Sequence, residues 1–444
     1  MAGRAHWSNR LAFVFAAAGS AIGLGNIWKF PYITGVNGGG AFVLIYLACI
    51  AAVGVPILIA EMYIGQKGQA NTVTSFENTH KTGSPWQIAG WMGLLAALLI
   101  LSFYSVVGGW ILDFEYRSLL SEFSGMSTEQ IQGTLGSLFS SPVRMLLWHF
   151  VFMAMVIGIV IAGVKDGLER WNKILMPALF GIIIILLIRV VAMDGFSKAI
   201  AFLFSFDASK LTARGVLEAL GHSFFTLSLG MGAILTYGSY LSEKESLPRV
   251  AVLVAFLDTF IALLAGVIIF TIVFSFNLEP GAGPGLIFST LPSLFVQMPG
   301  GNLLSIAFFL LVTFAALTSA VSILEVPVAY FSEKKGWGRK KTTTLIGAII
   351  FLLGIPCALS FNVMGEFKII GLNVFDLFDK FSSNILLPVG GMIIALFFGW
   401  VLGEKAVNSA LDGYPPIAKT LFIWSVRVLA PIGVLVMIIN TFSS

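Results

Sequence analysis

The chain alternates long apolar runs with short polar connections along its whole length. Runs of about twenty apolar residues, the length needed to cross a hydrocarbon core about 30 Å thick, recur throughout. They predict an all-α membrane protein with about eleven transmembrane helices. The runs fall near residues 11–35, 40–65, 88–112, 143–163, 168–192, 214–241, 248–276, 302–331, 342–361, 374–402 and 416–440.

Two of these runs, the first and the sixth, are interrupted by glycine-flanked polar residues, at 20–26 and at 226–232. A helix that unwinds inside hydrocarbon strands backbone polar groups at a cost of several kcal/mol each, so such breaks persist only where they are buried in protein or line a cavity. Interrupted helices in corresponding places of two halves point to the substrate and ion site of a secondary transporter.

The positions of the breaks also suggest how the chain is organised. If runs one to five and six to ten form two five-helix units, the odd number of helices makes the second unit inverted relative to the first. Helices 1 and 6 are then the discontinuous ones. This predicts a 5+5 inverted repeat with units at 1–192 and 214–402, followed by an additional eleventh helix and short tail at 416–444.

Composition supports a membrane protein, because 57% hydrophobic and only 11% charged residues cannot be buried in a water-soluble fold. A signal peptide is the alternative for the first run, since Arg4 and Arg10 precede three alanines. The apolar sequence continues without a cleavage-like spacer, which favours a membrane span.

Lysine and arginine set the expected orientation, because cytoplasmic loops are enriched in both. Under the eleven-helix prediction the richer set of connections, which includes Lys67, Lys165 and Lys340, falls on the same side as the N-terminus. We therefore expect a multi-pass cell-membrane protein with its N-terminus in the cytoplasm and its C-terminus outside. The net charge of +4 follows from this topology and needs no nucleic-acid partner.

Catalytic motifs are missing from the sequence. The two cysteines, Cys49 and Cys357, lie in apolar runs, and the four histidines form no metal-binding pattern. No Walker motif, filter-like repeated loop, or nucleophile with a base appears within the runs. An enzyme and a channel are therefore disfavoured, and any uphill transport must draw on an ion gradient.

Several motifs spread along the chain resemble those of the neurotransmitter:sodium symporters, a family with the 5+5 inverted-repeat fold. The resemblance is to the bacterial eleven-span members that carry hydrophobic amino acids. It implies a sodium-coupled symporter importing hydrophobic, aliphatic and aromatic, L-amino acids by alternating access. A proton-coupled amino acid transporter of the same fold is the alternative. The motifs are Gly23-Leu24-Gly25-Asn26-Ile27-Trp28-Lys29-Phe30-Pro31-Tyr32, Asn37-Gly38-Gly39-Gly40-Ala41-Phe42, Gly54-Val55-Pro56 with Glu61, Tyr104, Phe225-Thr226-Leu227-Ser228-Leu229-Gly230 and Leu317-Thr318-Ser319-Ala320.

The substrate site can be outlined from this resemblance. Unpaired N–H groups at a half-helix N-terminus suit an α-carboxylate, and the Tyr104 hydroxyl would be a second donor unless Tyr104 is an interfacial aromatic. No charged residue is expected in the pocket, and Met231 adapts to differing side-chain shapes unless it is simply packing. The resemblance assigns substrate contacts to Ala21, Gly23, Leu24, Gly25, Ile100, Tyr104, Phe225, Thr226, Ser228, Met231, Ser319 and Ile323.

Two sodium sites are implied in the same way, because freed carbonyls at helix breaks coordinate sodium. If the substrate carboxylate is a ligand at the first site, ion and substrate raise each other's affinity. For the hydroxyls of the second site, ordinary hydrogen bonding between helices stays an alternative. The first site would use Ala21, Asn26, Thr226 and Asp258, and the second Gly19, Ile22, Ala315, Thr318 and Ser319.

Asp258 departs from the common family pattern, in which a neutral amide occupies this place. An ionisable residue inside a span is costly and is a functional hypothesis by default. A partner of opposite charge is the alternative, but the one basic residue of the same run, Arg249, lies at its N-terminal end. Because Ala262 stands where relatives place a carboxylate one turn later, we expect Asp258 to supply the negative charge, so that no chloride is required.

Gates follow from charges near the first run. Lys29 with Asp379 resembles the family's outer gate, and Arg4 and Trp7 with Glu333 resemble the cytoplasmic latch. Exposed ion pairs contribute only about 0–1 kcal/mol, which suits contacts that break in every cycle. Arg427, deep in the last run, has no acidic partner that the sequence identifies.

Overall fold

The computed structural model describes residues 6–243, 245–279 and 285–443, and apart from one β-bridge between Ile369 and Leu372 its regular elements there are helices. Nine of the described helices are long and apolar enough to cross a membrane. The all-α membrane architecture is thereby confirmed. The nine are Gly40–Gly68, Gln87–Leu119, Pro142–Ile161, Val164–Val191, Leu247–Ser275, Gly301–Lys335, Arg339–Leu359, Val374–Ala410 and Pro416–Thr441.

The first and sixth apolar runs are the two that do not form one straight helix. The first is a bent pair, α1 (Arg10–Ala21) followed by Gly25–Val36 at an angle of 50°, which makes a tenth span. The sixth is divided into α12 (Ala213–Thr226) and α13 (Ala233–Gly238), and neither piece reaches spanning length. The count of eleven and the boundaries of the repeats therefore stay predictions, whereas both expected breaks are present.

Several spans join α-helical and π-helical segments, and π-helical turns are frequent at functional sites. The remaining elements of the spans are η1 (Gly25–Lys29), α2 (Phe30–Val36), α3 (Gly40–Cys49), η2 (Ile50–Gly54), α4 (Val55–Gly68), α6 (Gln87–Leu119), α9 (Pro142–Ile161), η3 (Val164–Glu169), α10 (Arg170–Val191), α14 (Leu247–Ser275), α16 (Gly301–Lys335), α17 (Arg339–Leu359), α18 (Val374–Phe381), η6 (Ser382–Leu386), α19 (Leu387–Leu396), η7 (Phe397–Leu402), α20 (Gly403–Ala410), α21 (Pro416–Trp424), η8 (Ser425–Leu429) and α22 (Ala430–Ser443). The connections carry α5 (Thr74–Thr79), α7 (Thr128–Gln132), α8 (Thr134–Phe139), α11 (Phe196–Phe204), η4 (Ala208–Lys210), η5 (Leu286–Thr290) and α15 (Leu291–Phe295).

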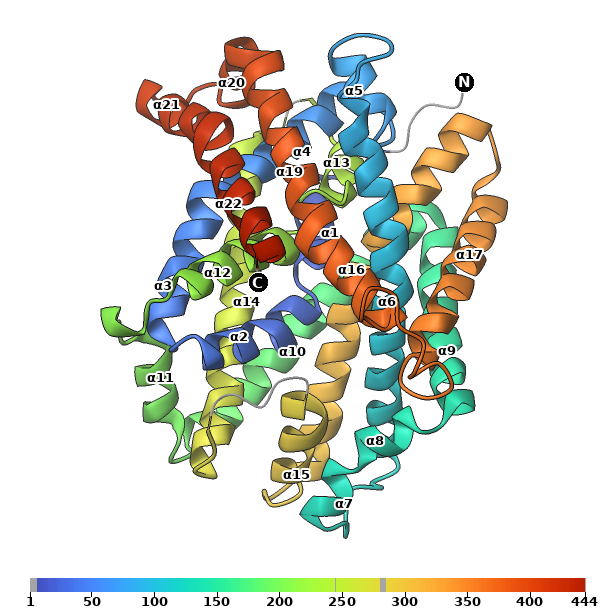
Figure 1. The fold of residues 1–444 in the computed structure, drawn as a ribbon, viewed down its shortest axis with the longest axis vertical. Coiled ribbons are helices and arrows are strands. Elements are labelled where there is room, and N and C mark those ends of the chain that lie inside the picture. The colour runs from blue at the N-terminus through green and yellow to red at the C-terminus, as the bar shows by residue number, and fades with distance from the viewer. Residues whose placement is uncertain (1–5, 244, 280–284, 444) are drawn as a thin grey trace.

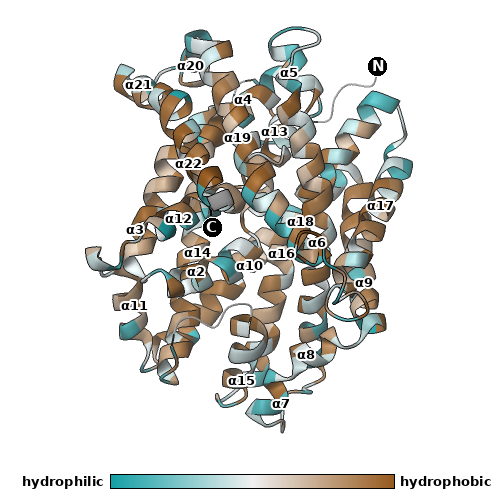
Figure 2. Ribbon diagram, viewed as in Figure 1, coloured by the Kyte–Doolittle hydropathy of each residue, from teal (hydrophilic) through white to brown (hydrophobic). Residues whose placement is uncertain are grey.

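Helix α1 lies at the centre of the bundle, where it contacts α10, α13, α14 and α16 (Figure 1). From Ala12 to Ala21 all of its residues except Phe15 are buried, as expected for a helix that is apolar on every side. The outer helices instead expose large apolar side chains, for example Ile185, Ile188 and Leu352. Apolar colour covers most helix faces, and polar colour gathers at helix ends and connections (Figure 2). Such an exterior suits lipid.

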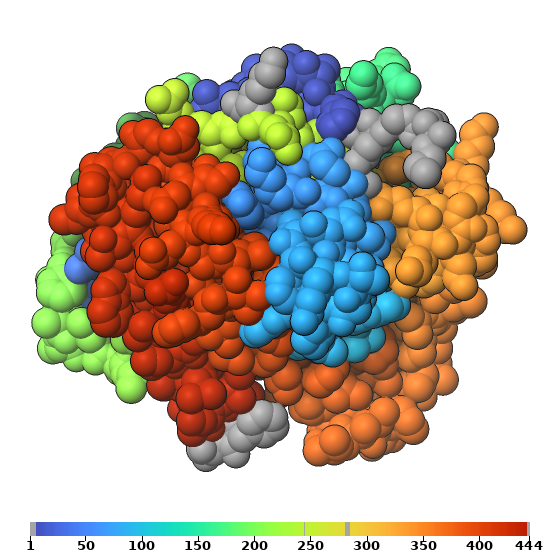
Figure 3. Space-filling view, turned by 90° about the horizontal axis from the view of Figure 1, so that it is seen from above, coloured from blue at the N-terminus to red at the C-terminus, as the bar shows by residue number. Residues whose placement is uncertain are grey.

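Seen from above, the C-terminal helices lie against the segment of α4 and α5 across much of this face of the molecule (Figure 3).

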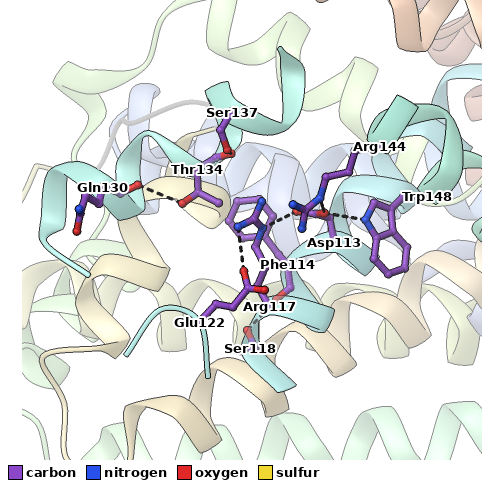
Figure 4. A network of polar contacts seen from close by, with 10 residues as sticks. All are labelled: Asp113, Phe114, Arg117, Ser118, Glu122, Gln130, Thr134, Ser137, Arg144 and Trp148. Carbon is purple, nitrogen blue, oxygen red and sulfur yellow. Dashed lines mark hydrogen bonds and ion pairs between the residues drawn. The ribbon is translucent and has the colours of Figure 1, made fainter. Parts of the chain in front are cut away.

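Near the C-terminal end of α6, a buried charge cluster ties this helix to α9 (Figure 4). Asp113, fully buried, accepts hydrogen bonds from Arg117 Nε at 2.8 Å, from Trp148 Nε1 at 2.7 Å and from Arg144. The carboxylate is therefore paired, as a buried charge must be, and the packing of α6 against α9 is fixed.

Candidate substrate and sodium site

The first break releases carbonyl oxygens that a continuous helix would have used. The amide of Gly23 donates to Asn26 Oδ1 at 2.9 Å instead of to the Gly19 carbonyl. The amide of Asn26 donates to the Gly23 carbonyl at 3.2 Å instead of to Ile22. Because each carbonyl of a helix normally accepts from the residue four positions later, Gly19 and Ile22 lose their helical donors here. Both are predicted sodium ligands.

The second break is built differently, with positive φ angles at Ser228, Gly230 and Gly232. The Gly230 amide donates to Glu61 Oε1 on α4 at 2.7 Å, which releases the Thr226 carbonyl. Ser228 Oγ donates to the Ser20 carbonyl at 2.8 Å and so joins the two breaks directly.

A small cavity lies between the two breaks. Its volume is about 10 Å³, which is about the room that one water molecule needs. No lysine, arginine, aspartate or glutamate lines it. All of the predicted substrate contacts except Tyr104 do, namely Ala21, Gly23, Leu24, Gly25, Ile100, Phe225, Thr226, Ser228, Met231, Ser319 and Ile323.

Tyr104 lies at the edge of this cavity, where its hydroxyl oxygen accepts a long hydrogen bond from the Leu24 amide at 3.4 Å. A Cβ on Gly23 would lie 3.1 Å from that hydroxyl and 3.1 Å from Ser319 Cβ. A side chain at position 23 would therefore fit only if Ser319 and Tyr104 moved by a few tenths of an ångström, and the Tyr104 hydroxyl faces the backbone of the first break.

Two of the predicted ligands of the first sodium site, Asn26 and Thr226, meet at the third, Asp258, which is fully buried. Its carboxylate accepts from Asn26 Nδ2 at 2.7 Å, from the Thr226 hydroxyl at 3.0 Å and from the Tyr46 hydroxyl at 3.4 Å. These donors are neutral, and no ion pair involves Asp258 in the described residues. A buried carboxylate without a counter-charge is costly, so this residue set fits a cation.

The predicted second site lies between α1 and α16. A Cβ on Gly19 would lie 3.2 Å from Thr318 Cβ, and Ser319 Oγ donates to the Ser20 carbonyl at 3.2 Å. The Thr318 hydroxyl donates to its own helix, to the carbonyls of Phe314 at 3.0 Å and Ala315 at 3.1 Å. The structure thus brings Gly19, Thr318 and Ser319 together, and their role in binding sodium stays a prediction.

The predicted outer gate is not an ion pair in this structure. Lys29 Nζ lies 4.6 Å from the ring centroid of Phe225, and Asp379 accepts from the Ser383 hydroxyl at 2.9 Å. Phe225 lines both the small cavity and a larger cavity of about 720 Å³, which is also lined by Lys29 and His222. The two cavities therefore share the Phe225 side chain.

The predicted inner latch is described only in part, because Arg4 lies outside the described residues. Trp7 is buried, and its Nε1 donates to the Tyr237 carbonyl at 3.0 Å. Glu333 Oε2 accepts from the backbone amide of Asn71 at 2.7 Å and from its side chain at 2.9 Å. Trp7 thus packs against α13.

Sequence reasoning missed a buried charge cluster beside Trp7. Glu325, fully buried on α16, accepts from the Tyr240 hydroxyl at 2.7 Å and pairs with both terminal nitrogens of Arg339 at 3.0 and 2.5 Å. The Tyr240 ring packs edge-on against Trp7. A carboxylate inside an apolar run was itself the signal, but the sequence did not identify its partner.

Arg427 also finds its partners in the fold. Its Nε donates to the Gly399 carbonyl at 2.7 Å, and its guanidinium lies 4.9 Å from the ring centroid of Trp400. Both groups belong to the π-helical segment η7. Arg427 therefore ties the last span to the one before it.

Comparison with known proteins places this geometry in a family. The sodium:neurotransmitter symporter family matches residues 4–131 and 130–444. The chain is 38% identical to the uncharacterized sodium-dependent transporter YhdH of Bacillus subtilis, covering 98% of this chain and 97% of that protein. It is 26% identical to the sodium- and chloride-dependent GABA transporter 2 of Homo sapiens, with 95% and 76% covered.

A solved structure is similar over the whole fold. The crystal structure of MhsT in complex with L-phenylalanine superposes with a TM-score of 0.92 at 48% identity, covering 99% of this chain and 100% of that one. The matched sequence, the all-helical fold and the paired breaks agree. The chain belongs to the sodium:neurotransmitter symporter family of secondary membrane transporters.

Proposed function

We propose that this protein imports hydrophobic amino acids, aliphatic and aromatic, together with two sodium ions and without chloride. Membership of the sodium:neurotransmitter symporter family supports the dependence of transport on sodium. The observation that supports the substrate class is the small cavity between the two helix breaks, which is lined by residues of both breaks and by apolar side chains, with no charged residue among its lining. The phenylalanine bound by MhsT is a ligand of this class.

The backbone around Leu24 and Gly25 suits the substrate carboxylate. These residues begin the half-helix Gly25–Val36, whose first N–H groups and positive dipole end attract an anion. Tyr104 adds a hydroxyl donor beside Leu24. A zwitterionic amino acid would place its carboxylate here and its side chain against Ile100, Phe225, Met231 and Ile323.

The cavity must widen to admit any amino acid, since it has room for about one water molecule. Met231 lies between two glycines with positive φ, Gly230 and Gly232. Glycine adopts such angles at no steric cost, and the unbranched Met side chain adjusts to differing shapes. Both features support a site that accepts small aliphatic and large aromatic side chains.

The first sodium ion would use the Ala21 and Thr226 carbonyls, the Asn26 side chain and Asp258. In this arrangement Asp258 supplies the negative charge that chloride provides in other members of the family. The substrate carboxylate would be a further ligand, so that ion and substrate each strengthen the binding of the other. This reciprocal coupling is what makes the transport a symport.

The second sodium ion would be held by neutral oxygens alone, from Gly19, Ile22, Ala315, Thr318 and Ser319. In alternating access, the side of the bundle that carries Lys29 and Asp379 would open to the outside. The side that carries Arg4, Trp7 and Glu333 would open to the cytoplasm. Lys29 forms no ion pair with the residues that the structure describes, which is compatible with an outer-gate contact that forms only in part of the cycle.

Uptake into proteoliposomes tests the proposal. Radiolabelled leucine should accumulate only with an inward sodium gradient, should persist when gluconate replaces chloride, and should be competed by Leu, Ile, Val, Phe, Tyr and Trp. Uptake driven by a proton gradient without sodium would favour the proton-coupled alternative. Stronger competition by Glu, Lys or a non-amino-acid would show that the pocket assignment is wrong.

A further inference from the structure

A basic cluster joins α16 to α17 at the end of the bundle that also carries α5, α20 and α21 (Figure 1). Its arginine, Arg339, pairs with Glu325 inside the bundle. Its four lysines are exposed and form no ion pair with the residues that the structure describes. The proposed transport cycle gives these lysines no role. They are Lys334, Lys335, Lys340 and Lys341.

The two halves of this cluster differ in how well they suit their helices. Lys334 and Lys335 lie in the last turn of α16, where a positive charge is favourable because it complements the helix dipole. Lys340 and Lys341 lie in the first turn of α17, where the dipole end is itself positive and no acidic residue offsets it. The stability of α17 therefore does not account for its two lysines.

Trp337, in the loop between the two helices, indicates the depth at which these lysines lie. Its side chain is partly buried and its ring stacks on Phe331, with the ring centroids 6.3 Å apart. Lys341 Nζ lies 5.2 Å from the centroid of the Trp337 ring. Tryptophan is enriched at the membrane–water interface, at the level of the lipid headgroups. The ammonium group of Lys341 is therefore held at the depth of the lipid phosphates.

The exposed face of α17 that continues from Lys341 is apolar. Leu345, Ile349 and Leu352 are 40%, 40% and 61% exposed, and their spacing puts them on the same face of the helix as Lys341. Hydrophilic colour at the loop gives way to mostly hydrophobic colour along α17 (Figure 2). A surface that passes from lysines to exposed aliphatic side chains is complementary to a molecule with a phosphate at one end and an acyl chain at the other.

We propose that Lys340 and Lys341 bind the phosphate of an anionic phospholipid, whose acyl chain lies along the apolar face of α17. Clusters of basic residues directly beside a membrane span attract anionic lipid headgroups, and each one strengthens binding roughly fivefold. The inference goes beyond the proposed function, because it requires neither the substrate site nor the sodium sites.

Titration of the purified full chain with phosphatidylglycerol tests this site, because a ligand of the folded state raises its melting temperature. The rise should saturate with phosphatidylglycerol, whereas phosphatidylcholine with the same acyl chains, or inorganic phosphate, should have little effect. In Lys340→Gln combined with Lys341→Gln, the half-saturating concentration of phosphatidylglycerol should increase about 25-fold, fivefold for each lysine. Lys341→Arg keeps the charge and should titrate like the parent.

Lys405→Gln combined with Lys419→Gln is the matched control, since these lysines lie on α20 and α21 at the same end of the molecule and the change in charge is the same. It should leave the titration unchanged. An equal shift in both double variants would overturn the proposal, because overall positive charge would then attract the lipid. Equal stabilisation by phosphatidylcholine or by inorganic phosphate would also overturn it, since an acyl chain alone or a free anion would then be sufficient.

Discussion

Each helix break leaves a glycine amide without its helical acceptor, and the two amides find their new acceptors in different parts of the chain. At the first, the Gly23 amide is satisfied by Asn26, three residues later in the same segment. At the second, the Gly230 amide is satisfied by Glu61, which lies on α4 and is separated from it by 169 residues. The first break is therefore encoded locally, whereas the second depends on how another helix packs against it.

The two proposed sodium sites differ in the same sense. The first contains a buried carboxylate, Asp258, and would share the substrate carboxylate. The second contains only neutral oxygens, from the first span and from α16. Charge should therefore dominate binding at the first site, whereas geometry should dominate at the second. Substitutions that remove either a charge or a neutral oxygen, one at a time, can separate the contributions of charge and geometry.

Asp258→Asn should have the largest effect. A carboxylate about 4 Å from sodium contributes on the order of 4 kcal/mol at an effective dielectric near 20. Loss of that charge should abolish or greatly weaken uptake in chloride-free buffer. Thr259→Ser, at the neighbouring position, is the control. Full, chloride-independent uptake by Asp258→Asn would place the charge elsewhere.

Glu61→Ala should come next, because it removes the acceptor for the Gly230 amide and leaves a buried N–H unpaired. An unsatisfied buried group costs about 1–3 kcal/mol, so leucine binding should weaken about tenfold to a hundredfold while helical circular dichroism is retained. Glu61→Gln keeps an oxygen acceptor and should recover most of the binding. No recovery by Gln would mean that the negative charge of Glu61, rather than its hydrogen bond, supports the second break.

Thr318→Ala combined with Ser319→Ala should weaken the sodium dependence of leucine binding by about tenfold, corresponding to about 1.4 kcal/mol. The hydroxyls would be lost without a change in charge, so the protein should still fold and the effect should be smaller than that of Asp258→Asn. Thr313→Ala, another buried threonine on α16, is the control. An unchanged sodium titration in the double variant would leave these hydroxyls only their hydrogen bonds within the bundle.

The features that could be predicted from the sequence are those written in short segments. The breaks at Ser20–Asn26 and Thr226–Gly232 are visible as glycines and polar residues inside apolar runs, and the cavity between them has the expected lining. Asp258 stood out because a charge in a span is rare. Each of these signals is local, so no knowledge of helix packing was needed.

The partners of distant residues could not be predicted, because they depend on which helices pack together. Glu61 was visible as part of a family motif, but its hydrogen bond with Gly230 was not. The same holds for Glu325 with Arg339 and for the position of Lys29 over Phe225 rather than beside Asp379. These contacts join helices far apart in sequence, and one short motif does not specify such a pairing.

Met231→Leu should have the smallest effect and tests whether the second break sets the breadth of selectivity. Leucine has nearly the same volume as methionine, and such swaps usually cost less than about 1.5 kcal/mol. The branched leucine side chain has fewer ways to fit around a ligand than the unbranched thioether. Tryptophan binding should therefore weaken a few-fold relative to leucine binding, measured as the ratio of their competition constants. Ile100→Leu, in the same cavity but on the unbroken helix α6, should leave that ratio unchanged. An equal shift in both variants would mean that cavity volume, and not the adaptable residue between Gly230 and Gly232, determines which side chains are accepted.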